Sequence, residues 1–268
     1  MRVFVVGSGS SGNSILVETR TTRLVVDAGI GPKAMARRLR ALDRELEGLR
    51  VDGILPTHEH VDHCGRAEML ARATGAPVYL HDGVTAERLR ARHEVRRVVV
   101  GHDLAIGDVT VTTVAVPHDA PNVAVRVEHR GVSVAVATDL GHVTPAVLDL
   151  LAGADVVVLE ANHCPRLLAA GPYPGALKRR VAGDVGHLSN EQAAAALAEL
   201  RGARPLRAYL VHLSQVNNSV EQAHAVVRSR VRGMPVVAID HGAPFELDLA
   251  TPRRRRDVVY GQLSLRFG

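Results

Sequence analysis

Four side chains of metal-binding type lie within six residues of one another. The segment from His58 to His63 has the pattern H-x-H-x-D-H. Side chains two positions apart on extended backbone point the same way, so His58 and His60 can bind one cation from the same side. Asp62 and His63 begin the next turn, where they can face a second cation. Neutral imidazoles and a carboxylate are typical ligands of zinc or manganese. The alternative, a histidine-rich solvated loop, does not require this spacing.

Composition narrows the class of protein that carries this motif. Hydrophobic residues make up 46% of the 268 residues, which argues against a disordered chain and allows one sizeable core. The formal charge is +5, and arginine supplies almost all of it because Lys33 and Lys178 are the only lysines. Arginine binds phosphate through two parallel N–H bonds, so the charge permits a polyanionic substrate, although a coding bias toward arginine explains it equally well. Aromatic residues, at 3%, leave few rings on which nucleic-acid bases could stack.

Cysteine usage and hydropathy predict a cytoplasmic protein. Cys64 and Cys164 are too few and too far apart for a disulfide framework or a cysteine-type zinc site, and they fit a reducing compartment. The apolar start of the chain is too short for a secretory signal. No apolar run approaches the roughly 18 residues of a membrane span. We therefore expect no association with a membrane.

The hydrophobic pattern predicts two β-rich halves, each with helices. Helices are expected to begin at Gly31-Pro32, near Arg66, at Thr144-Pro145 and at Ser189, where Ser189 to Gln192 has the form of a capping box. This order favours two sheets packed face to face in a single domain of residues 1–250, followed by an arginine-rich tail of residues 251–268. Strands are predicted at residues 3–6, 14–18, 23–27, 51–55, 78–80, 98–100, 109–116, 123–127, 132–136, 208–211 and 236–239.

Three further segments, together with the histidine motif, resemble the metallo-β-lactamase superfamily in sequence and in order. They are Val25-Val26-Asp27-Ala28-Gly29, Pro117-His118-Asp119-Ala120 and Ala137-Thr138-Asp139-Leu140-Gly141. The resemblance implies an α/β fold, a four-layer αββα sandwich with two divalent metal ions, zinc or manganese, at the lip between the sheets. It also implies that His118 completes the first metal site and that Asp139 bridges the two ions.

The last metal ligand must be chosen from three histidines near the end of the chain, His187, His212 and His241. The segment Leu210-Val211-His212-Leu213-Ser214 follows a β run and resembles the L-x-H-x-S ending of the nuclease-like branch of the superfamily, which includes ribonuclease Z. His212 is therefore the expected ligand, and His241 is expected to lie in a turn after a strand.

Within the superfamily, almost the whole chain resembles the bacterial YycJ type, also called WalJ. The segments that carry this resemblance are residues 7–14, 186–191 and 212–218. It implies 5′-to-3′ exonuclease action on DNA, in which a hydroxide shared by two ions attacks phosphorus. Asp62 is expected to orient that hydroxide, and His187 is expected to assist the leaving group.

Other residues are weaker candidates. His187 precedes a predicted helix N-terminus, which favours phosphate binding, but packing or helix capping is the alternative. Ser11 and Asn13 lie in a Gly/Ser loop that could contact phosphate or form a plain hairpin, and Ser189 is a further candidate for contact with substrate. We predict that one carboxylate holds a metal-binding histidine and that a second, by resemblance, supports His187 or forms a salt bridge elsewhere. Two more ambiguous histidines are expected to be structural or supporting residues. The carboxylates are Asp27 and Glu160, and the histidines are His142 and His163.

Three other functions fit the same ligands. A small-molecule phosphodiesterase acting on a cyclic phosphate could use the same site. A thioester or lactam hydrolase is disfavoured by the nuclease-like ending at His212. A non-catalytic DNA-binding module would bind DNA without turnover. No pattern in the sequence indicates an oligomeric state.

Overall fold

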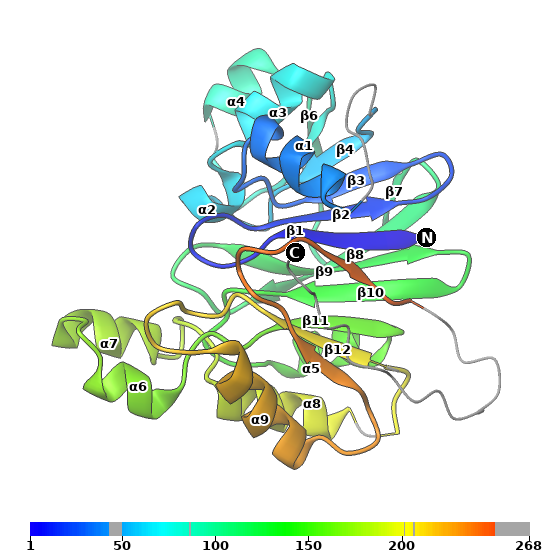
Figure 1. Ribbon diagram of the computed structural model, residues 1–268. Coiled ribbons are helices and arrows are strands. Elements are labelled where there is room, and N and C mark those ends of the chain that lie inside the picture. The colour runs from blue at the N-terminus through cyan, green and yellow to red at the C-terminus, as the bar shows by residue number, and fades with distance from the viewer. Residues whose placement is uncertain (43–49, 86, 201, 206, 250–268) are drawn as a thin grey trace, which may run out of the picture.

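Two seven-stranded β-sheets pack face to face in the part of the chain that the structure describes (Figure 1). The structure is a computed structural model that describes residues 1–42, 50–85, 87–200, 202–205 and 207–249. Helices cover the outer face of each sheet, so the layers follow the order α, β, β, α. The predicted four-layer sandwich is confirmed. The arginine-rich tail of residues 251–268 lies outside the described residues, and its boundary at residue 250 stays a prediction.

The first sheet has the strand order β14-β1-β2-β3-β4-β5-β6. Its strands are β1 (Arg2–Gly7), β2 (Ser14–Glu18), β3 (Arg23–Val26), β4 (Gly53–Leu55), β5 (Val78–His81), β6 (Val95–Val98) and β14 (Phe245–Leu247). The strands from β3 to β6 are parallel, and the others pair antiparallel. The helices between these strands are α1 (Pro32–Arg40), α2 (Val61–Cys64), α3 (Ala67–Thr74) and α4 (Glu87–Arg92).

The second sheet has the strand order β13-β12-β11-β10-β9-β8-β7. Its strands are β7 (Leu104–Ile106), β8 (Val109–Val116), β9 (Asn122–His129), β10 (Val132–Ala137), β11 (Val156–Glu160), β12 (Arg207–Val211) and β13 (Val236–Ala238). The strands from β10 to β13 are parallel. The accompanying helices are α5 (Pro145–Ala152), α6 (Pro165–Ala170), α7 (Gly175–Val181), α8 (Asn190–Glu199) and α9 (Val220–Arg230).

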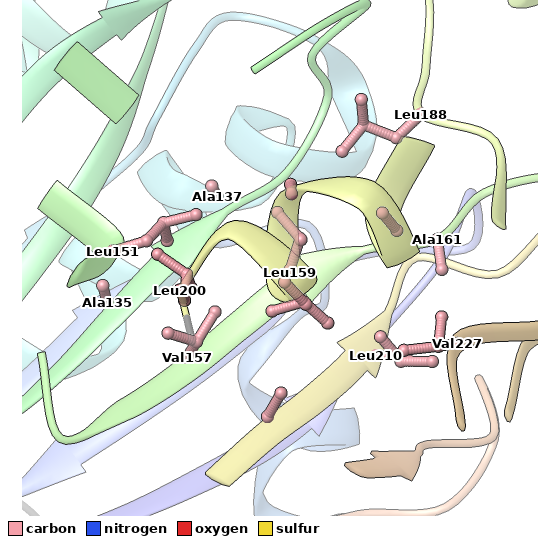
Figure 2. Close-up of a cluster of buried hydrophobic side chains, with 14 of the residues drawn as sticks. Ala135, Ala137, Leu151, Val157, Leu159, Ala161, Leu188, Leu200, Leu210 and Val227 are labelled. Carbon is pink, nitrogen blue, oxygen red and sulfur yellow. The ribbon is translucent and has the colours of Figure 1, made fainter. Parts of the chain in front are cut away.

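The buried hydrophobic side chains form three layers, one between the two sheets and one between each sheet and the helices outside it. Along each strand, successive side chains belong to different layers. In β1, Val3 and Val5 face the space between the sheets, whereas Phe4 and Val6 pack against the helices outside the first sheet. Successive side chains of a strand point to opposite faces, so a strand covered on both faces must be apolar at every position. Outside the second sheet, β10, β11 and β12 bury their other face against α5, α8 and α9 (Figure 2).

The predicted strands and helix starts agree with the structure except at a few places. The run of residues 98–100 was expected to be a strand, but β6 ends at Val98. Val99 and Val100 are exposed because the chain turns there, with Gly101 at a φ of 84°. Asp27 was expected to end a strand, but β3 stops at Val26 because Asp27 adopts a φ of 61°. The pattern did not single out β7, β11, β14, α6, α7 or α9.

Helix capping follows the predicted residues. The Thr144 hydroxyl accepts a hydrogen bond from the Val147 N–H at the start of α5. Ser189 and Gln192 form the predicted capping box of α8. Among the described helices the longest, α9, has 11 residues, and none is long and apolar enough to cross a membrane.

Candidate metal centre

The candidate ligands lie where parallel strands of both sheets end. In the second sheet, Asp139 follows β10, Glu160 is the last residue of β11 and His212 follows β12. In the first sheet, Asp27 follows β3 and the H-x-H-x-D-H segment follows β4. The carboxyl ends of parallel strands meet at one edge of a sheet, where open α/β folds bind their ligands. Because the two sheets face each other, the two edges bring both sets of side chains together.

Three of these side chains are on backbone in the left-handed region. Asp27, Asp139 and His212 have φ values of 61°, 56° and 56°. A non-glycine residue in this region costs free energy, so surrounding contacts must hold it there. The Asp27 N–H donates to the Leu55 carbonyl, and the His212 N–H donates to the Ser8 hydroxyl at 2.8 Å. These bends turn each side chain away from its strand and toward the centre.

His58, His60 and His118 form one group of candidate ligands. One ring nitrogen from each lies within 4.8 Å of the others, a spacing that suits a shared cation. The His118 Nε2 lies 3.3 Å from the His60 Nδ1, and the His118 Nδ1 lies 3.2 Å from the Gly186 carbonyl. His58 is fully buried, and its Nδ1 contacts the Thr57 hydroxyl at 3.1 Å.

Asp62, His63 and His212 form a second group with the same spacing. The Asp62 Oδ2 lies 3.6 Å from the His63 Nε2 and 3.5 Å from the His212 Nε2. Asp62 and His63 are in the first turn of α2, the position that their spacing predicted.

Asp139 lies between these two groups. Its Oδ2 is 3.8 Å from the His58 Nε2 and pairs closely with the His63 Nε2. Its Oδ1 is 3.4 Å from the His212 Nδ1. The carboxylate is 2% exposed, so it faces these histidines in a space from which water is largely excluded.

The buried polar atoms fit a cation. Among the described residues, the His58 Nε2 and both Asp139 oxygens have no hydrogen-bond partner of suitable geometry. Buried polar atoms are normally paired, so unpaired nitrogen and oxygen atoms that point at one another fit ligands of a shared metal ion. Burial and the neighbouring histidines lower the pKa of His58 to about 2, which keeps its imidazole in the neutral form that binds metals.

Side chains behind the ligands hold them in place. The Asp27 Oδ2 lies 2.7 Å from the His63 Nδ1, and the other Asp27 oxygen accepts hydrogen bonds from the N–H and hydroxyl of Thr57. Burial lowers the pKa of His63, but the charges of Asp27 and Asp139 outweigh it and raise this pKa to about 10. A metal ion that binds His63 must therefore displace a proton.

His187 and Glu160 form a pair beside the candidate metal ligands, and together with Asp139 and His212 they make a further group of side chains with metal-binding spacing. The His187 Nδ1 lies 2.7 Å from the Glu160 Oε1 and 3.1 Å from the Asp139 Oδ1. Glu160 is fully buried and also accepts hydrogen bonds from the Leu188 N–H and from His212. Burial lowers the pKa of His187, but the charges of Glu160 and Asp139 raise it to about 10. Such an imidazole can hold a proton for a leaving group.

The structure places the predicted substrate contacts at different depths. Ser11 is exposed on the Gly/Ser loop. Asn13 is buried, and its amide nitrogen lies 2.8 Å from the His63 Nε2 and 3.4 Å from the Asp62 Oδ2, so it contacts the candidate ligands directly. The Ser189 hydroxyl caps α8. Contact of these three residues with substrate stays a prediction.

The other histidines lie outside the candidate ligand groups of the described residues. His142 is exposed and contacts the Asp184 carbonyl through its Nδ1. His163 is buried, and burial lowers its pKa. His241 lies in a turn after β13.

Sequence reasoning did not assign a role to Asp119 or Arg180. The Asp119 Oδ1 lies 3.3 Å from the Nε2 atoms of His60 and His118, and its Oδ2 accepts a hydrogen bond from the Arg180 Nε at 2.6 Å. The position of Asp119 next to His118 could have drawn attention to it. Nothing in the sequence around Arg180 signals a contact with a residue 61 positions away.

The αββα sandwich and the paired ligand groups at its edge define a metal-dependent hydrolase with the metallo-β-lactamase fold. Residues 22–213 match the family model described as "Beta-lactamase superfamily domain". The exodeoxyribonuclease WalJ of Streptococcus pneumoniae is 33% identical over 262 residues, which cover 92% of this chain and 95% of that protein. The exodeoxyribonuclease YycJ of Bacillus anthracis is 33% identical over 264 residues, which cover 96% of this chain and 97% of that protein. The chain therefore belongs to the beta-lactamase superfamily and, within it, to the WalJ/YycJ family.

A solved structure agrees on the fold. The zinc-bound PqqB of Methylobacterium extorquens superposes with a TM-score of 0.70 at 19% identity, covering 93% of this chain and all of that chain. The similarity extends over both sheets, because the compared region includes nearly every described element.

Proposed function

We propose that this protein is a two-metal phosphodiesterase that removes nucleotides from the 5′ end of DNA. The observation that carries the proposal is the arrangement of seven side chains into two ligand groups on either side of Asp139. Two-metal sites of this kind suit in-line displacement at phosphorus. The names of the WalJ and YycJ relatives, both exodeoxyribonucleases, support a DNA substrate.

Two of the ligand groups support a division of the side chains between two ions. His58, His60 and His118 would hold one ion, Asp62, His63 and His212 would hold the other, and Asp139 would contact both. The mixture of imidazoles and carboxylates suits zinc or manganese. When bound, two such ions lower the pKa of water and neutralise the charge that develops on the phosphate oxygens.

The chain's own residues orient the reactants. Asp62 is part-exposed and lies at the open side of the ligand groups, and its hydrogen bond with His212 helps to keep its pKa below the usual value despite burial. Its ionised carboxylate can therefore orient the attacking water and accept a proton from it. The Nδ1 of His187 is held by Glu160, which leaves the Nε2 to donate a proton to the leaving oxygen.

The chain's charge suits a DNA substrate. The formal charge is +5, and most of the basic side chains are arginines, whose guanidinium groups match phosphate oxygens in pairs. Binding that neutralises several phosphates releases counterions, so DNA affinity should fall steeply with added salt.

The test uses two oligonucleotides, one labelled at its 5′ end and one at its 3′ end, incubated with metal-loaded protein. We expect early release of single labelled nucleotides from the 5′ label and a gradually shortening ladder from the 3′ label. An Asp62→Ala protein must be inactive in parallel, because otherwise a contaminating nuclease explains the result. Intact DNA alongside rapid cleavage of a cyclic phosphate would refute the proposal and favour a small-molecule phosphodiesterase.

A further inference from the structure

A small cavity adjoins the candidate metal centre, and apart from His187 its wall has no role in the hydrolysis described above. Its volume is about 160 Å³. His187 belongs to its wall, so the cavity opens beside the pair formed by His187 and Glu160. We call it the side pocket. Its polar wall includes Ser10, Asn162, Tyr173, Arg180, His187 and Ser214.

One wall of the side pocket comes from a strongly basic segment. Residues 165–182, which contain α6 and α7, include four basic side chains and no acidic one. Both helices project from the body of the molecule at the lower left of Figure 1. The segment is tied to the candidate centre because the His187 N–H donates to the Val181 carbonyl at 2.9 Å. The positive charge of this segment, so close to the candidate centre, attracts polyanions.

Arg180 places a cation in the side pocket. Its Nε and Nη2 both lie 2.6 Å from the Asp119 Oδ2, so the guanidinium offsets the charge of the one carboxylate in the pocket wall. Its side chain is 58% exposed. Two of its five N–H groups are engaged in this way, and the other three make no hydrogen bond with any described residue. A guanidinium with unengaged N–H groups can bind two oxygens of a phosphate at once.

The size of the side pocket limits what it can take. Pockets that enclose a whole small molecule usually have a volume of about 300 Å³ or more. The side pocket is therefore large enough to enclose a phosphate group but too small to enclose a whole nucleotide.

We infer that the side pocket binds the 5′-terminal phosphomonoester of the DNA strand, with Arg180 as its cation. This inference rests on the proposed function and adds a reason for exonuclease rather than endonuclease action. A terminal phosphomonoester carries a charge of about −1.5 to −2, whereas an internal diester carries about −1, so a cation in a small pocket favours the end of a strand. With the end held there, the adjacent phosphodiester lies toward the metal ligands.

The experiment measures binding of fluorescent oligonucleotides to metal-loaded protein, with phosphorothioate linkages at the 5′ end to prevent cleavage. Three ligands are compared: one with a 5′-phosphate, one with a 5′-hydroxyl, and one with a 5′-hydroxyl and a 3′-phosphate. The third has the same net charge as the first. We expect the 5′-phosphate to bind at least about tenfold more tightly than either of the others, which is the effect of one charge-assisted contact.

The variants test Arg180 directly. Arg180→Gln should abolish the preference for a 5′-phosphate, and Arg180→Lys should retain part of it because the charge remains. Arg179→Gln is the matched control, since Arg179 is an exposed neighbour on α7 that does not line the pocket, and it should retain the full preference. Elemental analysis of each variant must show unchanged metal content, because Arg180 contacts Asp119 beside His60 and His118.

Equal binding of the 5′- and 3′-phosphorylated ligands by the wild-type protein would overturn the inference, as would a preference that survives in Arg180→Gln. A preference that depends on Arg180 in a protein that cleaves no DNA would support the side pocket while refuting the proposed exonuclease. Normal exonuclease action without any 5′-phosphate preference would refute only the side pocket.

Discussion

At the candidate centre, buried carboxylates that are not themselves proposed as metal ligands hold the imidazole rings in position. Asp27 fixes the His63 ring through its Nδ1, and Glu160 contacts both His187 and His212. Such contacts orient ligand rings and raise their basicity. The charges of Glu160 and Asp139 raise the pKa of His187 to about 10 despite its burial, so its imidazole is protonated at neutral pH in the metal-free protein. Cations bound by the neighbouring ligands would disfavour the protonated imidazole and would lower this pKa toward the range suited to an acid catalyst.

We predict that His187→Ala lowers turnover by roughly 10²–10⁴, the usual effect of losing a general acid or a phosphate contact. Metal content should stay unchanged, as measured by elemental analysis. His142→Ala is the control, because His142 is exposed and outside the candidate ligand groups, and its turnover should match the wild type. Loss of a metal ion from His187→Ala would show that His187 is a ligand, and unchanged turnover would show that its role is structural.

The ends of helices and strands are fixed by polar side chains that join neighbouring elements. Asp155 precedes β11, and its Oδ2 accepts hydrogen bonds from the N–H and hydroxyl of Ser133 in β10. Arg204, in the connection between α8 and β12, pairs with the same carboxylate at 2.8 Å. Asp155 is 6% exposed, and its carboxylate joins the start of β11 to β10 and to the connection that precedes β12.

This arrangement predicts a pH-dependent contribution to stability. Burial alone would raise the pKa of Asp155, but Arg204 and Ser133 outweigh it and lower the pKa. A carboxyl group with a lowered pKa in the folded state stabilises the protein above its unfolded pKa of about 3.9 and loses that effect as the pH falls through the folded value. We expect Asp155→Asn to reduce the free energy of unfolding by roughly 1–3 kcal/mol at pH 7, as measured with urea.

The difference between wild type and Asp155→Asn should shrink as the pH falls from about 4 toward the lower pKa of Asp155 in the folded state, because in this range the carboxyl group is protonated in the unfolded chain before it is protonated in the folded one. In an Arg204→Gln background the same substitution should have a smaller effect at pH 7, since its main partner is already gone. A difference in stability that is constant between pH 7 and pH 3 would contradict this role for Asp155.

Across the whole molecule, the candidate metal ligands come from both sheets. His58, His60, Asp62 and His63 follow a strand of the first sheet, whereas Asp139 and His212 follow strands of the second. Metal ions at this edge would therefore join the two halves of the sandwich. A ligand that binds only the folded state stabilises it in proportion to the logarithm of its concentration over its Kd.

We predict two divalent ions per chain in the purified, fully loaded protein, and a lower Tm after their removal with a chelator. At a metal concentration about 1,000 times the Kd, each ion contributes roughly 4 kcal/mol. Elemental analysis and thermal unfolding with and without chelator measure both quantities. Asp139→Asn is the comparison, since it weakens the ligand between the two groups and should reduce the chelator's effect on Tm. One ion per fully loaded chain, or a Tm that does not respond to the chelator, would contradict the two-metal assignment.

Most strands, several helix starts and the ligand segment from His58 to His63 follow from the sequence, because they depend on the spacing of residues that are close together in the chain. The alternation and length of apolar runs set the strands, and hydroxyl groups at Thr144 and Ser189 set helix starts. Four candidate ligands lie within six residues, so an extended segment and one helical turn are enough to bring His58 and His60 to one side and Asp62 and His63 to the other. The resemblance to a known superfamily then supplied His118, Asp139 and His212.

Other features were decided only by the tertiary structure, because they join residues that are far apart in the chain. Packing of the two sheets brings His212 to within 3.5 Å of Asp62, although 150 positions separate them. The pairing of β1 to β4 within the first sheet places Asn13 against His63, and the connections of the second sheet bring Arg180 to Asp119. The left-handed backbone of Asp27, Asp139 and His212 is likewise imposed by contacts across the fold, since none of these residues favours that conformation as glycine does. Local spacing determines which side chains can face the same way, and only the packing of the two sheets determines which of them meet.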